Sequence, residues 1–453
     1  MSAPNKLSKL NKFSSILLGG VLLSLMCCVN NTVGFGNYWE TVSVGFVFTL
    51  LIFSFYGNRA KMKFELISIG AVFFSLSSLS GIFANVIFFN NVIFSALLGF
   101  SLLGLYGIFI GSIFSLKEYK IYHYLILAVL FFAAVLVSKV TFSHILLRII
   151  SPETASDFKA GLEENGINLY WREAYLNNFN DINFAGSVSG GLEYYNYINI
   201  ISYAFASLVL IVLIALFFRD KITALVSLLI NVISAAIVTA LNFIFSYCLN
   251  YNNSSIKILS LCFALGFGLM LIIALIPNKY SAGRKYRSEP YIQNRFLRLI
   301  VNFILFEITC VIAPVRILIY NLAQNAKEYN ILFFLTNYKI LIIAGISLII
   351  GLIIFNIFKK NIYDKNLPVP FKIKPVDFSR KAICIFTFYY SMTYLLTGNA
   401  PLVRFVYRVI KNPSVFPKIL TDDSFILLPI VALFSILFFV IYFPAKKRLF
   451  SHH

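Results

Sequence analysis

Residues 196–249 read NYINIISYAFASLVLIVLIALFF, RDK, ITALVSLLINVISAAIVTALNFIFSYCL, two apolar runs separated only by Arg219, Asp220 and Lys221. Each run has the length of about 20 residues that an α-helix needs to cross the hydrocarbon core of a bilayer. In lipid a single segment can satisfy its backbone hydrogen bonds internally only as a helix. This stretch therefore predicts two membrane-spanning helices joined by a very short link.

The whole chain shares this character. Its 453 residues are 59% hydrophobic and 12% charged, with a mean hydropathy of +0.84. Soluble domains are about half apolar and a quarter charged, so a soluble globular protein is excluded. The 48 Phe and 26 Tyr exclude a disordered chain. Barrel strands alternate over about ten residues, unlike these continuous runs. We therefore predict an all-α, polytopic membrane protein.

Twelve apolar runs are long enough to span a bilayer. The first begins with basic residues, as a signal peptide does, but no small-residue cleavage site follows, so we interpret it as an uncleaved span. The predicted spans are 13–33, 41–57, 64–86, 91–116, 121–150, 196–218, 222–249, 255–277, 297–321, 330–358, 381–399 and 424–443.

The distribution of positive charge predicts the orientation. With both chain ends in the cytoplasm, the inside segments hold 26 of the 38 Lys and Arg, as the positive-inside rule requires. The net charge of +20 then marks cytoplasmic loops rather than a nucleic-acid partner. We expect a multi-pass protein whose partner is the lipid bilayer, and the high Phe, Ile, Asn and Lys content favours a bacterial inner membrane.

The twelve spans divide into two groups of six. We predict a first half over 1–218, which includes a polar outside loop at 151–195, and a second half over 219–453 that ends in the cytoplasm. The loop 151–195 is interpreted either as a small folded cap or as a lid over an outward-facing pathway.

Four ionisable side chains fall inside predicted spans, where such groups are costly and usually face protein or water. Glu307 and Arg316 share one span, but nine residues place them on opposite faces and about 13 Å apart along the axis, so each needs another partner. The four residues are Lys139, Glu307, Arg316 and Lys339.

Two readings of these charges stay open. Arg316 and Lys339 lie at similar depth on neighbouring spans, with Arg404 and Arg408 just outside, and such a cluster suits an anionic ligand. Alternatively, the long cationic side chains, Lys139 included, extend to the interface. Glu307 is either a proton-coupling carboxyl or the structural counter-ion of a buried Lys.

Other chemistry has little support in the sequence. The six Cys form no Cys-x-x-Cys pair, and two of the four His are the last two residues, so we expect no metal site and no cofactor. No phosphate-binding loop of the Gly-x-x-x-x-Gly-Lys-Ser/Thr type occurs. Asn231 and Asn242 are expected to form hydrogen bonds between helices.

The loop after the second span contains Gly57, Asn58, Arg59 and Lys63, and a second basic, Gly-containing loop, 281–287, follows the eighth span. With twelve spans and both ends inside, the chain resembles the major facilitator superfamily, which has a Gly-x-x-x-Asp-Arg-x-Gly-Arg-Lys type loop at this place. The resemblance implies that these four residues form a cytoplasmic gate loop. The chain departs from the family by its three-residue link at 219–221 and its 45-residue outside loop.

Three functions remain open. The first is a secondary transporter, proton-coupled at Glu307, for a small anionic or polar solute. The second is a polymerase, ligase or flippase for polyprenyl-linked envelope glycans, which would use loop 151–195 and outward cations to hold a lipid-linked anionic substrate. The third is a non-catalytic membrane subunit. Whether the chain is an enzyme is therefore left undecided, with the transporter preferred.

Overall fold

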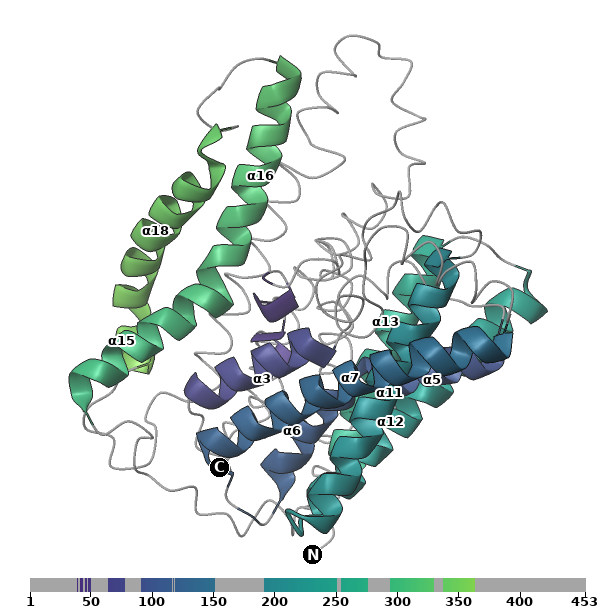
Figure 1. Ribbon diagram of the computed structural model, residues 1–453. Helices are drawn as coiled ribbons and strands as arrows, with labels where there is room; N and C mark the ends of the chain where they lie inside the picture. Colours follow the sequence, from purple (N-terminus) through teal and green to yellow (C-terminus); the bar gives the residue numbers. More distant parts are fainter. Residues whose placement is uncertain are drawn as a thin grey trace, which may run out of the picture. The chain divides into compact units, whose positions relative to one another are not determined.

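The computed structural model describes residues 39–49 in part, 64–77, 91–150 apart from 116 and 118, 191–250, 254–275, 294–329 and 337–362. Every regular element in these ranges is a helix (Figure 1). Five of the described helices are long and apolar enough to cross a membrane, or six if one bent pair counts as a single span. The predicted all-α class is therefore confirmed for the described residues, these apolar helices are compatible with the predicted membrane protein, and the count of twelve spans stays a prediction.

The helices named below fall on eight of the predicted spans, the span 41–57 is described only in part, and the predicted spans 13–33, 381–399 and 424–443 lie outside the described residues. The elements are α3 (Phe64–Ser77), α5 (Val92–Leu102), α6 (Gly104–Phe114), α7 (Ile121–Ile150), α11 (Gly191–Leu216), α12 (Lys221–Asn242) with the π-helical η1 (Phe243–Cys248), α13 (Ser254–Leu275), α15 (Arg295–Phe306), the π-helical η2 (Glu307–Val311), α16 (Ile312–Tyr329) and α18 (Lys339–Ile362).

Three boundaries differ from the sequence prediction by five residues or more. Helix α16 continues to Tyr329, eight residues past the predicted end of its span. Helix α11 begins at Gly191, inside the segment predicted as the outside loop, because the polar residues before the apolar run continue the helix. Helix α18 begins only at Lys339, nine residues after the predicted start of its span. The apolar side chains show where a hydrophobic run lies, but they do not show at which residue the helix begins.

Short polar side chains define several helix starts. The side chain of Asn91 accepts a hydrogen bond from the backbone N–H of Ile93 at the start of α5, and Asn294 accepts from the N–H groups of Phe296 and Leu297 at the start of α15. Such N-caps satisfy backbone donors that have no acceptor within the helix.

Two compact units make up the chain, Leu76–Lys257 and the combination of Met1–Ser75 with Ile258–His453. The predicted boundary at 219–221 lies in the first of these, between α11 and α12, which pack against each other. The division into two six-helix halves stays a prediction.

A broken helix forms the core of the unit Leu76–Lys257. Helices α5 and α6 meet at Leu103 with a bend of 45°, where the sequence predicted one continuous span over 91–116. Every residue of α6 is buried, and both helices pack against α11 and α12. A Cβ on Gly99 would lie 2.5 Å from Cα of Ala235 on α12, so only glycine permits this approach.

Helix α7 packs on α11 along one face and exposes the other. Phe131 and Tyr203 have ring centroids 5.7 Å apart, and the Ser138 hydroxyl donates to the Ser202 carbonyl at 3.2 Å. On the opposite face of α7, Leu125 and Val129 are 66% and 60% exposed. An apolar face of this size is the surface that a membrane protein presents to lipid.

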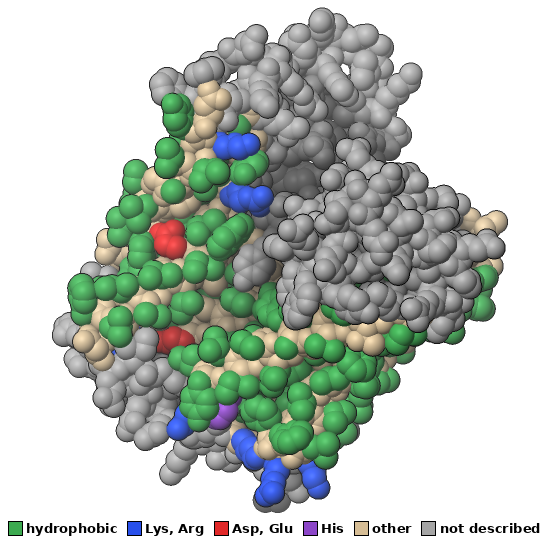
Figure 2. Space-filling view, viewed as in Figure 1, with side chains coloured by type: hydrophobic (Ala, Val, Ile, Leu, Met, Phe, Trp, Pro, Cys, Tyr) green, Lys and Arg blue, Asp and Glu red, His purple; other side chains and the backbone are tan. Residues whose placement is uncertain are grey.

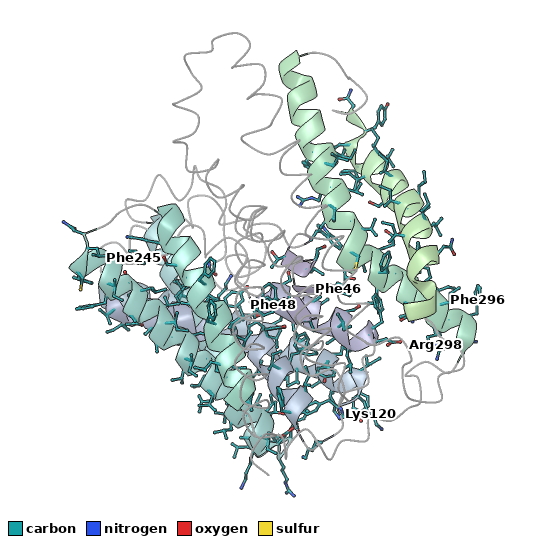
Figure 3. The ribbon with its side chains drawn as sticks, turned by 180° about the vertical axis from the view of Figure 1, so that it is seen from behind. Phe46, Phe48, Lys120, Phe245, Phe296 and Arg298 are labelled. Atoms are coloured by element: carbon teal, nitrogen blue, oxygen red, sulfur yellow. The ribbon has the colours of Figure 1, made fainter. Side chains whose placement is uncertain are left out.

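Aromatic side chains hold the other unit together. Phe64 of α3 lies 5.8 Å from Phe46 and 6.5 Å from Phe306 of α15, measured between ring centroids. Phe48 packs in the same way on Phe74. Phe46 and Phe48 lie beside α3 in the view of Figure 3. These rings connect the start of the unit to its α15–α18 helices.

Helices α15, η2 and α16 follow one another as a bent rod, and α18 runs back along it (Figure 1). The outward face of α18 is apolar, with Ile340 and Leu341 each 70% exposed. Figure 2 shows the same character across the described part of the visible face, where hydrophobic side chains predominate and charged ones gather at few places.

Candidate functional site

The two antiparallel arms of the α15–α18 helices are aligned by three sets of contacts. Phe303 and Phe306 both pack on Phe355, with ring centroids 5.3 and 5.8 Å apart. Further along, Glu307 lies against Gly351, and Tyr320 lies near Lys339. Residues further along the first arm contact residues further back on α18, which is the order of contacts in an antiparallel helical hairpin.

Glu307 opens the π-helical turn η2. Pro314, seven residues later, has no backbone N–H for the Cys310 carbonyl and its ring crowds that carbonyl. The wider turn at η2 just before it accommodates the proline, and such turns recur at functional sites. The sequence therefore places an acidic residue at the one irregular turn of this membrane-spanning helix.

The Glu307 carboxyl occupies the space that a side chain at Gly351 would fill. A Cβ added to Gly351 would overlap Oε1 and Cδ of Glu307. The Oε1 atom is buried, and no donor in the described part of the chain reaches it. The structure thus seats one carboxyl oxygen in the contact between two helices, while the residue as a whole is half-buried.

Helix α18 contributes one buried stripe to this contact. Ser347, Gly351 and Phe355 recur every four residues, and Ser347 is 4% exposed. The Ser347 hydroxyl has no hydrogen-bond partner among the described residues. It lies one helical turn, about 6 Å along the axis, from the glycine that receives the Glu307 carboxyl.

Two cations from different helices meet at the ring of Tyr320. Arg316 of α16 and Lys339 of α18 each place their charge 5.0 Å from the ring centroid, so the charged groups are at most 10 Å apart. Two positive charges at that separation repel by roughly 2 kcal/mol at an effective dielectric constant of about 20. The attraction of each cation to the ring offsets part of this cost.

The predicted proximity of Arg316 and Lys339 therefore appears in the structure. Glu307 and Arg316, expected not to pair, indeed have different neighbours, Gly351 and Tyr320. Lys139 lies half-buried on α7, in the other unit. Arg404, Arg408 and the gate-loop residues Gly57, Asn58, Arg59 and Lys63 lie outside the described residues.

Sequence reasoning missed Tyr320, Ser347 and Gly351. Tyr320 is an ordinary aromatic residue near a helix end, and serine and glycine are common in membrane helices. The one available signal was the spacing of Ser347 and Gly351, which a search for small residues four apart would have found.

A second polar cluster surrounds Asp220, which precedes α12 and is 4% exposed. Its carboxylate accepts hydrogen bonds from the Tyr119 hydroxyl at 2.8 Å, the Thr223 hydroxyl at 2.8 Å, the Thr223 backbone N–H at 3.1 Å, and the Ser115 hydroxyl. Lys117 donates to the carbonyl of Phe218 beside it. These bonds tie the segment after α6 to the link between α11 and α12.

The titration of this cluster follows from its hydrogen bonds. Burial opposes the ionised form of Asp220, but the bonds from Ser115, Thr223 and Tyr119 outweigh it and hold the pKa of this carboxyl below its ordinary value. Burial, above all, raises the pKa of Tyr119, so its phenol stays neutral and donates. Both carboxylate oxygens accept hydrogen bonds from within the protein, three at Oδ2 and one at Oδ1, which favours a structural role for this cluster.

The two asparagines of α12 behave differently. Asn242 donates from Nδ2 to the Ser95 hydroxyl of α5 at 2.7 Å, the interhelical bond that the sequence predicted. Asn231 is fully buried, and neither of its amide atoms has a partner among the described residues. Asn231 lies beside α6, with Oδ1 3.3 Å from the position of a Cβ on Gly107.

In the described part of the chain, no group of three or more His, Cys, Asp or Glu side chains could hold a metal ion. The described cysteines, Cys248 and Cys310, are free thiols, one exposed and one buried. No protein-family model matches the chain, and neither a curated protein nor a solved structure matches it. The side chains of the α15–α18 helices are therefore the features from which a function can be inferred.

Proposed function

We propose that the chain is a multi-pass secondary transporter that couples proton movement to the passage of a small anionic solute. The observation that carries the proposal is the Glu307 carboxyl, seated against Gly351 in the contact between two membrane helices. An ionised carboxylate is costly in such a place unless water or a cation reaches it. A proton removes the charge, so binding and release of a proton is the chemistry that suits this position.

In the proposed mechanism, the helices open alternately to the two sides of the membrane, and this change moves the proton. When the helices open to one side, water reaches Glu307 and the carboxyl can ionise; when they close, the neutral form fits the dry contact better. The π-helical turn at Glu307 and the missing side chain at Gly351 make this the least regular part of the contact. The twelve-span arrangement of the major facilitator type, with both ends in the cytoplasm, belongs to this proposal.

The charge of the solute is inferred from Arg316 and Lys339. Both lie on the same pair of helices as Glu307, and both point to the ring of Tyr320. Two cations beside one ring suit a solute of negative charge. Cations in this position are also what a glycan polymerase needs to hold a lipid-linked pyrophosphate, so that enzyme is the second candidate.

Purified full-length protein in liposomes with an entrapped pH indicator tests the transporter. Phosphate, succinate and glutamate are added outside in turn, and at least one is expected to drive protons across the membrane. Glu307→Gln should reduce this flux at least tenfold, because the amide cannot exchange a proton. Glu65→Gln, which alters a half-buried acid at the start of α3, is the matched control and should leave the flux unchanged.

The proposal fails if none of the three anions moves protons through the wild-type protein, or if Glu307→Gln transports with undiminished proton coupling. Loss of long-chain surface glycan on Arg404→Ala or Arg408→Ala, with normal uptake, would favour the polymerase instead.

A further inference from the structure

We infer that Ser227 and Asn231 of α12 bind a water molecule beside Gly107 of the broken helix, in the interior of the unit Leu76–Lys257. All the residues that carry the inference lie within this one compact unit. None of them has a role in the proposed function, which concerns helices of the other unit. The water site therefore stands or fails independently of the transporter.

The buried face of α12 is a polar stripe along most of the helix. Its buried side chains include Thr223, Ser227, Asn231, Ser234 and Asn242. Helices α5 and α6 both pack against α12. A polar side chain inside a membrane protein is costly unless it has a hydrogen-bond partner. The partners of each member of the stripe therefore show where a bound ligand is needed.

The two ends of this stripe find their partners within the protein. At one end, Thr223 donates to Asp220 from both its hydroxyl and its backbone N–H. Towards the other end, the Ser234 hydroxyl donates to a backbone carbonyl of its own helix, and Asn242 donates to Ser95 of α5. Each of these side chains thus has a protein partner.

The middle of the stripe differs from its ends. Ser227 and Asn231 are fully buried, yet the Ser227 hydroxyl and both amide atoms of Asn231 have no hydrogen-bond partner among the described residues. Asn231 lies ten residues, about 15 Å, from the start of α12, which is half the depth of the hydrocarbon core. Bulk water does not reach these groups at that depth, so a bound partner is needed to offset the cost of their burial.

Gly107 of α6 provides the space for such a partner. A Cβ added there would lie 3.3 Å from Oδ1 of Asn231, 3.5 Å from the hydroxyl oxygen of Ser227 and 3.4 Å from a methyl carbon of Ile230, its nearest neighbours outside its own helix. The two polar atoms therefore border one common space of about the size of a methyl group, which is also about the size of a water molecule. At the other glycines of α5 and α6, an added Cβ would lie 2.7 Å or less from a neighbouring atom.

A third polar side chain lies close to Asn231. Ser207 of α11 places its hydroxyl in the side-chain space of Gly104, and Nδ2 of Asn231 lies 3.9 Å from the same point. The Ser207 hydroxyl donates to the Tyr203 carbonyl, and its oxygen can still accept a hydrogen bond. Polar groups of α11 and α12 thus gather beside the first residues of α6.

The chemistry of these groups favours water over a cation. The Asn231 amide offers both donors and an acceptor, and the Ser227 hydroxyl also donates and accepts. Water has the same dual character, and a buried water typically makes about three hydrogen bonds to polar groups that have no other partner. A cation would use only the oxygen atoms and would leave the amide N–H groups without an acceptor.

Hydroxyl-radical labelling of the full-length protein in nanodiscs tests the site. Millisecond X-ray irradiation converts water into hydroxyl radicals, which oxidise the side chains that the water touches, buried ones included. Ile230 borders the proposed water and is fully buried, as is Leu127 of α7, a side chain of similar reactivity. We expect mass spectrometry to show Ile230 oxidised at least fivefold faster than Leu127.

Two variants remove the water in different ways. Gly107→Ala places a methyl group in its space, and Asn231→Leu removes the amide at nearly constant volume. Each should slow the oxidation of Ile230 at least fivefold. Ser234→Ala is the matched control, because Ser234 is a buried serine of the same stripe whose hydroxyl already has a partner. It should leave the oxidation of Ile230 unchanged.

The comparison within the wild type needs no substitution, so it holds even where a variant does not fold. Equal oxidation of Ile230 and Leu127 in the wild type would overturn the water site. Unchanged oxidation of Ile230 in folded Gly107→Ala or Asn231→Leu would overturn it as well, and so would an equal loss in Ser234→Ala.

Discussion

Glu307 and Gly351 depend on each other at the scale of single residues, because the carboxyl of one fills the side-chain space of the other. Gly345, on the same helix, has no atom within 4 Å of an added Cβ. Gly345→Ala should raise stability by up to about 1 kcal/mol through helix propensity. Gly351→Ala should lose that gain, and reduce proton flux, because Glu307 must leave its place.

Thermal unfolding in detergent measures this difference between the two glycine variants. Gly351→Ala combined with Glu307→Ala should recover stability, since the colliding carboxyl is gone. Equal unfolding temperatures for Gly345→Ala and Gly351→Ala would show that the carboxyl does not occupy the contact.

The hydrogen bonds to Asp220 predict how the stability of the fold changes at low pH. Its pKa is lower in the folded protein than its ordinary value of 3.8, so the ionised form stabilises the fold. That contribution is complete at neutral pH, begins to decline as the pH falls below about 4, and is lost as the pH passes the folded pKa. Asp220→Asn should lower the unfolding temperature at pH 7 and remove part of the further fall between pH 5 and pH 3.

Unfolding curves at a series of pH values for the wild type and Asp220→Asn provide the measurement. Ser115→Ala, which removes one of the four donors to the carboxylate, should give an intermediate result. Parallel pH profiles for the wild type and Asp220→Asn would mean that Asp220 does not titrate as described.

At the scale of elements, the surroundings of α12 distinguish two asparagines that look alike in the sequence, Asn242 beside α5 and Asn231 beside α6. Asn242→Ala removes the bond to Ser95 and should cost about 1 kcal/mol, the usual value for a hydrogen bond between membrane helices. Asn231→Ala removes an amide with no partner among the described residues and should cost less. Unfolding of both variants in the same detergent decides the order, and a larger loss for Asn231→Ala would contradict it.

The helices themselves were predictable, because a long apolar segment in lipid can satisfy its backbone hydrogen bonds internally only as a helix. The runs at 121–150 and 222–249 correspond closely to α7 and to α12 with η1. The break at Leu103 was not predicted, although Ser101 and Gly104 flank it, because glycine and serine are also common in unbroken membrane helices. Local composition does not encode such a bend.

The candidate site was predictable only in part. Charges inside apolar runs are conspicuous, and equal depth on adjacent spans brought Arg316 and Lys339 together correctly. The rotation of each helix about its axis decides that both cations lie near Tyr320 and that Glu307 lies against Gly351. The sequence does not specify that rotation. The π-helical turn at η2 shifts that rotation, so a count of 100° per residue does not carry through it.

At the scale of the whole molecule, the proposed function depends on the alignment of η2 and α16 with α18 in the membrane. It places Glu307 inside a helix contact and brings two cations together further along the same helices. A different alignment would turn Glu307 away from Gly351 and separate Arg316 from Lys339. The alignment is therefore the central claim, and it can be tested without knowledge of the solute.

Disulfide cross-linking in native membranes is the most direct test. In a chain whose six cysteines are replaced by alanine, Glu307→Cys and Gly351→Cys together should form a disulfide on mild oxidation, because a Cβ added to Gly351 would overlap Cδ of Glu307, an atom only two bonds from the Glu307 Cβ. Glu307→Cys with Gly345→Cys should not, since position 345 lies about 9 Å away along the axis and on another face. Equal cross-linking of the two pairs, or cross-linking of the second alone, would contradict the account.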